Sequence, residues 1–203
     1  MEFRKDYSMA DRSNILYIIT DQQHAGAMSC AGNPDVHTPN MDSLAETGVR
    51  FTRAYCTHPL CGPQRASFMT GLYPHQNGST NNGTPIESEY KGQTLGNALA
   101  DAGYDCALSG KWHVSGTTPE ECGLEVICGS RDNEVPLRAI EYMKRDRDNP
   151  FFLFASFLNP HDICQVARNQ PLPQGPVPQP ETVEECPSLP ANFAIPPYSP
   201  DIL

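Results

Sequence analysis

The sequence predicts an α/β fold in which a mostly parallel central sheet is flanked by helices. Apolar runs of strand length, such as residues 14–20 and 151–158, alternate along the chain with segments of helical periodicity. These runs are apolar at nearly every position, which is typical of strands buried on both faces of a parallel sheet. The 203 residues suffice for one domain with a sizeable core, or for one and a part.

The first elements follow this alternation. Residues 14–20 (NILYIIT) are β-branched and aromatic and predict a strand that ends at an aspartate. A helix is expected between Thr38 as N-cap and Gly48, because Pro39 suits the first helical position. Residues 49–56 (VRFTRAYC) predict a second strand.

The later elements continue the pattern. Residues 63–71 (PQRASFMTG) predict a short helix that stops at a glycine, and residues 93–103 (QTLGNALADAG) predict a helix with regularly spaced apolar residues. A strand at 105–110 (DCALSG), a helix at 136–146 (PLRAIEYMKRD) and a strand at 151–158 (FFLFASFL) complete the set.

The two ends of the chain differ in composition from this core. Residues 1–13 form a polar leader, and residues 14–169 are expected to form the α/β domain. Residues 170–203 contain 10 of the 20 prolines, which predicts an extended segment rather than a helix or a central strand.

Composition excludes some functions. The formal net charge of −10 argues against a general nucleic-acid surface, although it permits a small anionic substrate in a local positive site. No membrane span is expected, because no stretch approaches the roughly 20 apolar residues that one needs. No signal peptide is visible, so the chain as given is expected to be cytoplasmic, or periplasmic or secreted if a leader is missing.

The eight cysteines are scattered and none forms a C-x-x-C motif, which argues against a zinc ribbon or a thioredoxin-type site. Most are expected to be small buried residues with free thiols. A disulfide between Cys122 and Cys128 remains an alternative.

Polar residues follow several expected strands. They form the segments 21–23 (DQQ), 111–113 (KWH) and 159–162 (NPHD), while Cys61 follows the expected strand at 49–56 by a short loop. In open parallel sheets ligands bind at the carboxyl ends of the strands. These four segments are therefore expected to meet at one edge of the sheet.

Four stretches resemble the motifs of the sulfatase family, of the alkaline-phosphatase-like superfamily, in the family's order and spacing between residues 14 and 162. They are NILYIITDQQ, HTPNMDSLAETGVRFTRAYCTHPLCGPQRASFMTGLYPHQNG with its C-x-P-x-R core, LSGKWH and FFLFASFLNPHD. The resemblance implies a formylglycine-dependent hydrolase whose substrates are sulfate esters of small molecules or carbohydrates.

The resemblance also implies the chemistry. Cys61 would be oxidised by a formylglycine-generating enzyme to an aldehyde, whose hydrate is a geminal diol. One hydroxyl takes the sulfuryl group, and the other then lets sulfate leave by C–O cleavage. A divalent metal, calcium in most members, would be held by Asp21, Gln22 and the modified Cys61.

Four further residues acquire roles from the resemblance. Arg65 would hold the diol and Lys111 would contact sulfate. His113 would take the proton that triggers sulfate release, and His161 would protonate the leaving alcohol or hold a sulfate oxygen. Lys111 and His113 are expected to share one face of an extended segment, with Trp112 on the other. The histidines expected to be structural are His24, His37, His58 and His75.

The chain departs from the family pattern in two respects. Gln64 stands where the family usually has a small residue, and no acidic-polar pair that would complete the metal site follows Asp162. The chain therefore resembles an N-terminal portion that is truncated at its C-terminus. Two alternatives stay open: a phosphonate or phosphodiester hydrolase of the same superfamily, and a truncated inactive fragment that lacks the C-terminal metal ligands.

Overall fold

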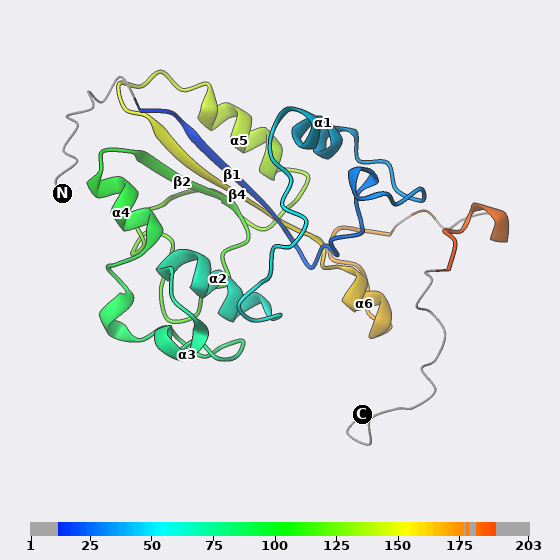
Figure 1. Cartoon of the computed structure of the whole chain (residues 1–203). Coiled ribbons are helices and arrows are strands. Elements are labelled where there is room, and N and C mark those ends of the chain that lie inside the picture. Colours follow the sequence, from blue (N-terminus) through cyan, green and yellow to red (C-terminus); the bar gives the residue numbers. More distant parts are fainter. Residues whose placement is uncertain (1–11, 177, 179–181, 190–203) are drawn as a thin grey trace. The chain divides into compact units, whose positions relative to one another are not determined.

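The computed structural model describes residues 12–176, 178 and 182–189. Residues 1–11 of the expected leader and much of the proline-rich segment lie outside the described residues. The described residues group into two compact units (Figure 1). The first comprises residues 12–23 and 52–174, and the second comprises residues 24–51 and the described residues from 175 onward.

The first unit is built on a four-stranded sheet whose strands all run parallel. The strand order is β1-β4-β2-β3, so that β4 lies at the centre and β1 at an edge. The fold predicted from the alternation of strands and helices is confirmed. The strands span Ile15–Asp21 (β1), Asp105–Gly110 (β2), Glu125–Cys128 (β3) and Phe151–Pro160 (β4).

Both faces of the sheet are packed, as the continuous apolar run of β4 predicts. Phe152 and Phe154 of β4 lie in one core cluster, together with Leu108 of β2. Phe151 and Leu153 belong to the cluster on the opposite face. Successive side chains of a strand point to opposite faces, so a strand covered on both sides is apolar at every position.

Helices cover each face of this sheet (Figure 1). Ala66 and Met69 of α2 pack into the cluster of Phe154, whereas Ala139 and Tyr142 of α5 pack on the other side. The helices of this unit span Cys61–Thr70 (α2), Pro74–Asn77 (α3), Leu95–Asp101 (α4), Val135–Met143 (α5) and Ile163–Ala167 (α6), with a 3₁₀ turn at Ser88–Tyr90 (η3).

The second unit is small. Its helix α1 spans Pro39–Thr47 and ends at Gly48, as the sequence predicts. Asp42 in its first turn accepts hydrogen bonds from Ser29 Oγ at 2.7 Å and Cys30 N at 2.8 Å, which joins the helix to the turn before it. Among the described residues of this unit, 3₁₀ turns lie at Ser29–Ala31 (η2) and Val183–Glu185 (η4).

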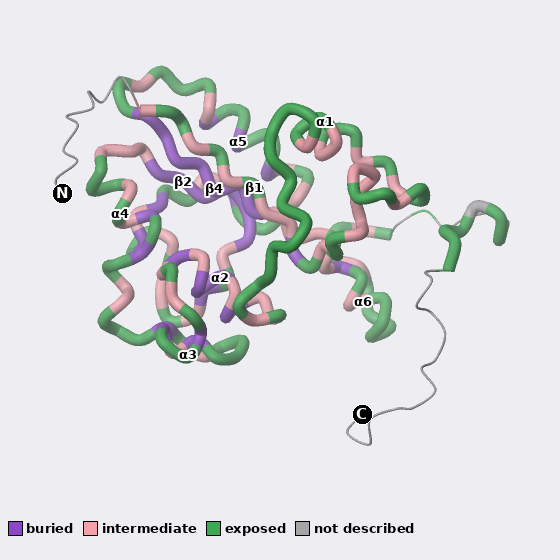
Figure 2. The backbone as a smooth tube through the Cα atoms, viewed as in Figure 1, coloured by how far each residue is buried: buried purple, intermediate pink, exposed green. Residues whose placement is uncertain are grey.

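The strand expected at 49–56 is absent: this segment is irregular. Its side chains Phe51 and Tyr55 are 80 % and 87 % exposed, and Figure 2 shows the surrounding chain as exposed. A strand forms only where a partner strand accepts its backbone hydrogen bonds, and a local apolar pattern does not supply that partner. The structure also adds elements that were not predicted, which are β3, α3, α6 and the 3₁₀ turns.

All eight cysteines are free, so the alternative of a Cys122–Cys128 disulfide is wrong. Both of these side chains are buried thiols, as is Cys106, whereas Cys56 and Cys186 are exposed. Across the described residues, no helix combines the length and apolar character needed to cross a membrane.

Candidate active site

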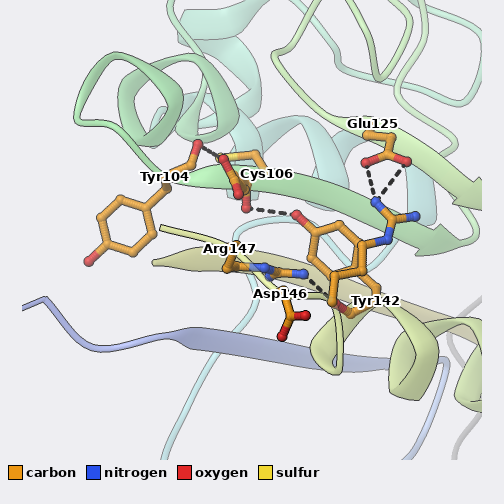
Figure 3. A pocket seen from close by; sticks show the side chains of 8 residues that line it. Tyr104, Cys106, Glu125, Tyr142, Asp146 and Arg147 are labelled. Carbon is orange, nitrogen blue, oxygen red and sulfur yellow. Dashed lines mark hydrogen bonds and ion pairs between the residues drawn. The ribbon is translucent and has the colours of Figure 1, made fainter. Parts of the chain in front are cut away.

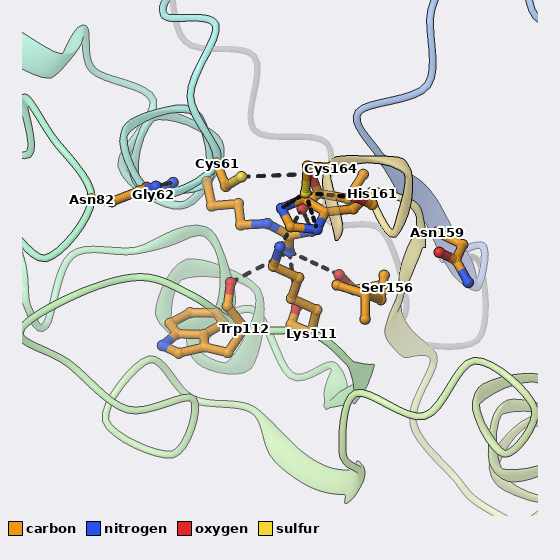
Figure 4. Close-up of polar contacts among 12 residues, drawn as sticks. Cys61, Gly62, Asn82, Lys111, Trp112, Ser156, Asn159, His161 and Cys164 are labelled. Atoms are coloured by element: carbon orange, nitrogen blue, oxygen red, sulfur yellow. Dashed lines mark hydrogen bonds and ion pairs between the residues drawn. The ribbon is translucent and has the colours of Figure 1, made fainter. Parts of the chain in front are cut away.

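Four segments meet at the carboxyl edge of the sheet (Figure 4). Asp21 ends β1, Cys61 begins α2, Lys111 follows β2 and His161 follows β4. The Cys61 thiol donates to Asp21 Oδ1 at 3.6 Å, and Lys111 Nζ lies 2.8 Å from Asp21 Oδ2. One ligand atom each from Asp21, Cys61 and His161 lies within 4.8 Å of the others. The polar segments that follow the strands thus form one site.

Arg65 ties the ends of three strands together. Its Nη2 donates to Asp21 Oδ2 at 3.0 Å, and its Nη1 donates to the Lys111 carbonyl and to Ser156 Oγ, each at 2.8 Å. The side chain is only 3 % exposed. A planar guanidinium with several fixed donors suits such a junction, because it can serve partners in different directions at once.

The Asp21 carboxylate is the negative centre of the site. Burial by itself would raise its pKa, but the hydrogen bonds and charges of Lys111 and Arg65 outweigh burial, and the pKa is lowered. Both cations share Oδ2, which leaves Oδ1 facing Cys61. Asp21 therefore stays ionised and presents one oxygen toward residue 61.

Cys61 is a poor nucleophile as a thiol. Burial raises its pKa, and the negative charge of Asp21 raises it further. Reactive cysteines have lowered pKa values, because the thiolate is the attacking species. Cys61 nevertheless occupies the first position of α2, where the helix dipole favours negative charge. The N-terminal position of residue 61 on α2 therefore suits chemistry on an anion. The unmodified thiol is not suited to that chemistry, because its pKa is raised.

Two predicted site residues have strained backbones. Gln22 and His113 both have positive φ angles, of 63° and 62°. A left-handed conformation costs a residue other than glycine roughly 1–2 kcal/mol, and such strain concentrates at functional sites. The expected extended backbone at residues 111–113 is thus wrong at His113. Trp112 packs against the core.

The His113 ring lies in a positive, partly buried environment. Burial lowers its pKa, and the charges of Lys111 and Arg65 lower it further. The ring is therefore neutral at pH 7 and can accept a proton.

The ring nitrogens of His161 contact a thiol. Cys164 Sγ lies 3.5 Å from Nδ1 and 3.9 Å from Nε2, and it donates to the His161 carbonyl at 2.8 Å. Figure 4 shows Cys164 beside the imidazole at the start of α6. Because a thiol is a weak hydrogen-bonding group, the imidazole keeps its capacity to bind a ligand.

Three residues of the site were missed by the sequence analysis. Ser156 is fully buried in β4, and its carbonyl accepts from Lys111 N at 2.8 Å while its hydroxyl binds Arg65. Asn82 Oδ1 accepts from Gly62 N at 2.9 Å at the start of α2. Gly110 lets β2 approach β4, since a Cβ there would lie 1.9 Å from the Ser156 carbonyl oxygen. For Ser156, the signal in the sequence was its position as a lone polar residue in the apolar run FFLFASFL.

Gln64, the departure from the family pattern, has a local role. Its Oε1 accepts from Thr57 N at 2.8 Å, from Thr57 Oγ1 at 3.0 Å and from His58 N at 3.3 Å. These contacts fix the loop that leads into α2. Gln64 therefore stabilises the loop that precedes Cys61.

A cavity of about 370 Å³ lies at the other end of the sheet, where β2 begins (Figure 3). Two of its arginines have partners within the lining: Arg145 binds Glu125 at 2.8 Å, and the Arg147 guanidinium lies 4.4 Å from the Tyr142 ring centre. The predicted site residues are absent from its lining. The cavity is thus separate from the candidate active site.

The described residues supply part of an oxygen-donor metal site. Asp21 Oδ1 is not engaged by either cation, and Gln22 follows directly in its left-handed conformation. Calcium takes six to eight oxygen ligands, and Asp21 and Gln22 supply only some of them. These residues fit the beginning of a calcium site but do not complete one.

The helix-flanked parallel sheet has the alkaline-phosphatase-like fold, and a charged cluster lies at its carboxyl edge. A sequence model of the sulfatase family matches residues 13–184. This match covers most of the chain, so the chain belongs to the sulfatase family.

Known proteins agree with this assignment. The chain is 42 % identical over 103 residues to an N-acetylglucosamine-6-O-sulfatase of Bacteroides thetaiotaomicron, a match that covers 51 % of this chain and 18 % of that relative. A solved structure in complex with its substrate D-glucosamine-2-N,6-O-disulfate superposes with a TM-score of 0.65 and 30 % identity, over 74 % of this chain and 35 % of that one.

A phosphonate monoester hydrolase of Agrobacterium radiobacter also superposes, with a TM-score of 0.62 and 22 % identity, over 74 % of this chain and 41 % of that one. At this identity the likeness shows the fold alone. The chain spans about a fifth to two fifths of the length of these proteins.

Proposed function

We propose that this chain carries the nucleophile half of a sulfatase active site, which hydrolyses sulfate esters of carbohydrates. The observation that carries the proposal is the contact of Cys61 Sγ with Asp21 Oδ1 at 3.6 Å, beside Lys111. Relatives that act on sulfated amino sugars support the substrate class.

Formylglycine at position 61, made by a formylglycine-generating enzyme, would supply a diol whose first hydroxyl takes the sulfuryl group and whose second permits its release. A divalent cation, which we propose to be calcium, would be held by Asp21, Gln22 and the oxygen of residue 61. When bound it would offset negative charge on sulfate.

The chain's own residues then have distinct tasks. Arg65 positions residue 61 indirectly, because it fixes Asp21 and the ends of β2 and β4. The ammonium group of Lys111 lies beside the Asp21 carboxylate, where it can stabilise sulfate oxygens as negative charge develops on them. Neutral His113 accepts a proton from residue 61 when sulfate is released, and His161 donates a proton to the leaving alcohol.

The proposal is tested by mass spectrometry of the peptide that contains residue 61, after co-expression with a formylglycine-generating enzyme. Oxidation of the thiol to the aldehyde gives a distinct loss of mass. Retention of the thiol, under conditions in which an established sulfatase is modified, would contradict the proposal.

Activity assays separate the two hydrolase classes. A full-length form that completes the metal site is expected, once modified, to prefer N-acetylglucosamine-6-sulfate and aryl sulfates over aryl phosphonate esters. A preference for the phosphonate would identify a phosphonate hydrolase instead. A modified chain without turnover on either ester would favour the inactive-fragment alternative.

A further inference from the structure

The unmodified site presents one sulfur, one nitrogen and one oxygen donor to a common point. Cys61 Sγ, a His161 ring nitrogen and an Asp21 carboxylate oxygen all lie within 4.8 Å of one another. They come from three separate elements, α2, the turn after β4 and the end of β1. The parallel sheet therefore brings them together, and their proximity does not depend on one flexible loop.

We propose that, while residue 61 is still a cysteine, these three side chains bind a thiophilic divalent cation such as Zn²⁺. Zinc takes thiolate, imidazole and carboxylate ligands in tetrahedral sites with three protein ligands and one water. Calcium, in contrast, takes oxygen ligands. The donor set with Cys61 therefore matches zinc, and it differs from the oxygen site that the modified residue would build.

The distances suit this geometry. In a tetrahedral site, a sulfur 2.3 Å and an oxygen 2.0 Å from zinc lie about 3.5 Å apart. Cys61 Sγ and Asp21 Oδ1 are 3.6 Å apart. The 4.8 Å limit on the remaining pairs leaves roughly 1 Å of side-chain movement for His161 to reach the same ion.

The charges and contacts leave these donors available. Arg65 and Lys111 both pair with Asp21 Oδ2, so that Oδ1 remains on the side of Cys61. The imidazole of His161 contacts only the weakly bonding thiol of Cys164 among the ring contacts that the described residues show. Zinc binding releases the thiol proton of Cys61 to solvent, and the resulting thiolate offsets one of the two positive charges of the ion, because Asp21 is already paired with Arg65 and Lys111.

Conversion of Cys61 to formylglycine would then change which metal ion the site at the carboxyl edge of the sheet prefers. Oxidation to formylglycine replaces the sulfur with oxygen, which removes the donor that favours zinc. The thiol form of the chain would be a zinc-binding form. Zinc binding requires no hydrolysis of any ester, so it can be tested apart from the sulfatase activity proposed above.

The test uses the whole chain expressed without a formylglycine-generating enzyme and verified by mass spectrometry to carry the Cys61 thiol. Titration with Co²⁺ as a spectroscopic substitute should give a sulfur-to-cobalt charge-transfer band that saturates at one ion per chain. Zn²⁺ should abolish the band, whereas a large excess of Ca²⁺ should leave it. Absence of the band, or its loss on adding Ca²⁺, would overturn the proposal.

Variants locate the ligands. C61A should lose the band, and H161A should bind at least about tenfold more weakly. C56A is the matched control, because it removes an exposed thiol from the loop before α2, and it should bind like the parent chain. A band that survives in C61A would assign the metal to other thiols and refute the site.

Alkylation of the parent chain gives a readout that does not depend on the folding of any variant. Zn²⁺ should protect Cys61 from iodoacetamide more than it protects Cys56, as measured by peptide mass spectrometry. Equal alkylation of Cys61 with and without Zn²⁺ would overturn the proposal.

Discussion

Arg65 Nη2 lies 3.0 Å from Asp21 Oδ2 inside the protein, where the two side chains are 3 % and 7 % exposed. The pair joins the first strand to the helix that carries Cys61, and Lys111 adds a second cation to the same carboxylate oxygen. Asp21 therefore organises the site as the shared counter-ion of two buried cations.

Asp21→Asn is expected to destabilise the chain strongly. The substitution leaves Arg65 and Lys111 buried without a counter-charge, and breaking a buried ion pair in this way costs about 3–5 kcal/mol. Urea unfolding measures the loss. E134Q is the control, since the Arg131–Glu134 pair is largely exposed and should contribute about 1 kcal/mol at most. Equal effects of the two substitutions would contradict the buried junction.

The stability contributed by Asp21 should depend on pH. The folded-state pKa of Asp21 is lowered relative to its ordinary value of 3.8. Its contribution is therefore complete above pH 3.8 and is lost as the pH falls through the lower, folded-state pKa. Urea unfolding of the parent and D21N between pH 7 and pH 2.5 should show a difference that shrinks below about pH 4. A constant difference over this range would count against the ionised pair.

Ser156→Ala tests a residue that the sequence analysis missed. The substitution removes the hydroxyl that accepts a hydrogen bond from the buried Arg65 guanidinium, a loss of about 1.5–3 kcal/mol. S109A is matched in burial and lies in the adjacent strand, but the Ser109 hydroxyl donates to a neutral carbonyl, that of Val135, instead of accepting from a buried cation. Its loss should be about 1 kcal/mol. If S156A unfolds at the same urea concentration as the parent, Ser156 does not support Arg65.

Gly110→Ala should also destabilise the chain. Gly110 has a φ of 114°, and an added Cβ would lie 1.9 Å from the Ser156 carbonyl oxygen. The backbones of β2 and β4 must separate, at a cost of about 2–4 kcal/mol. Thermal unfolding measures the effect, with G129A as control, because a Cβ at Gly129 meets nothing within 4 Å. A melting temperature unchanged from the parent would show that the strands can adjust freely.

The His113 ring should titrate below the ordinary histidine value of 6.5. Burial is the first cause of the lowered pKa, and the Lys111 charge is the second. K111M should consequently move the pKa of His113 upward, while K144M, which removes an exposed charge from the end of α5, should leave it in place. Histidine NMR titrations measure both. An unchanged or lowered pKa of His113 in K111M would show that the Lys111 charge does not act on the His113 ring.

The sequence determined the parallel sheet and most of its helices, because these depend on local patterns. The continuous apolar run of β4 requires burial on both faces, and Pro39 and Gly48 mark the ends of α1. The motifs around Asp21, Cys61, Lys111 and His161 also indicated which polar side chains lie together at the carboxyl edge of the sheet. The roles assigned to these residues, the domain boundaries at residues 13 and 169, the expected truncation and the cellular location stay predictions.

Only the tertiary structure decided how the site is held together. The strand expected at 49–56 does not form, because a strand needs a neighbouring strand and the local sequence does not show whether one is present. Ser156, Asn82 and Gly110 were missed because their contacts join segments that are remote in the sequence. Local patterns report which face of an element is apolar. They do not report which buried charge meets which carboxylate, since that depends on how separate strands are ordered and aligned in the sheet.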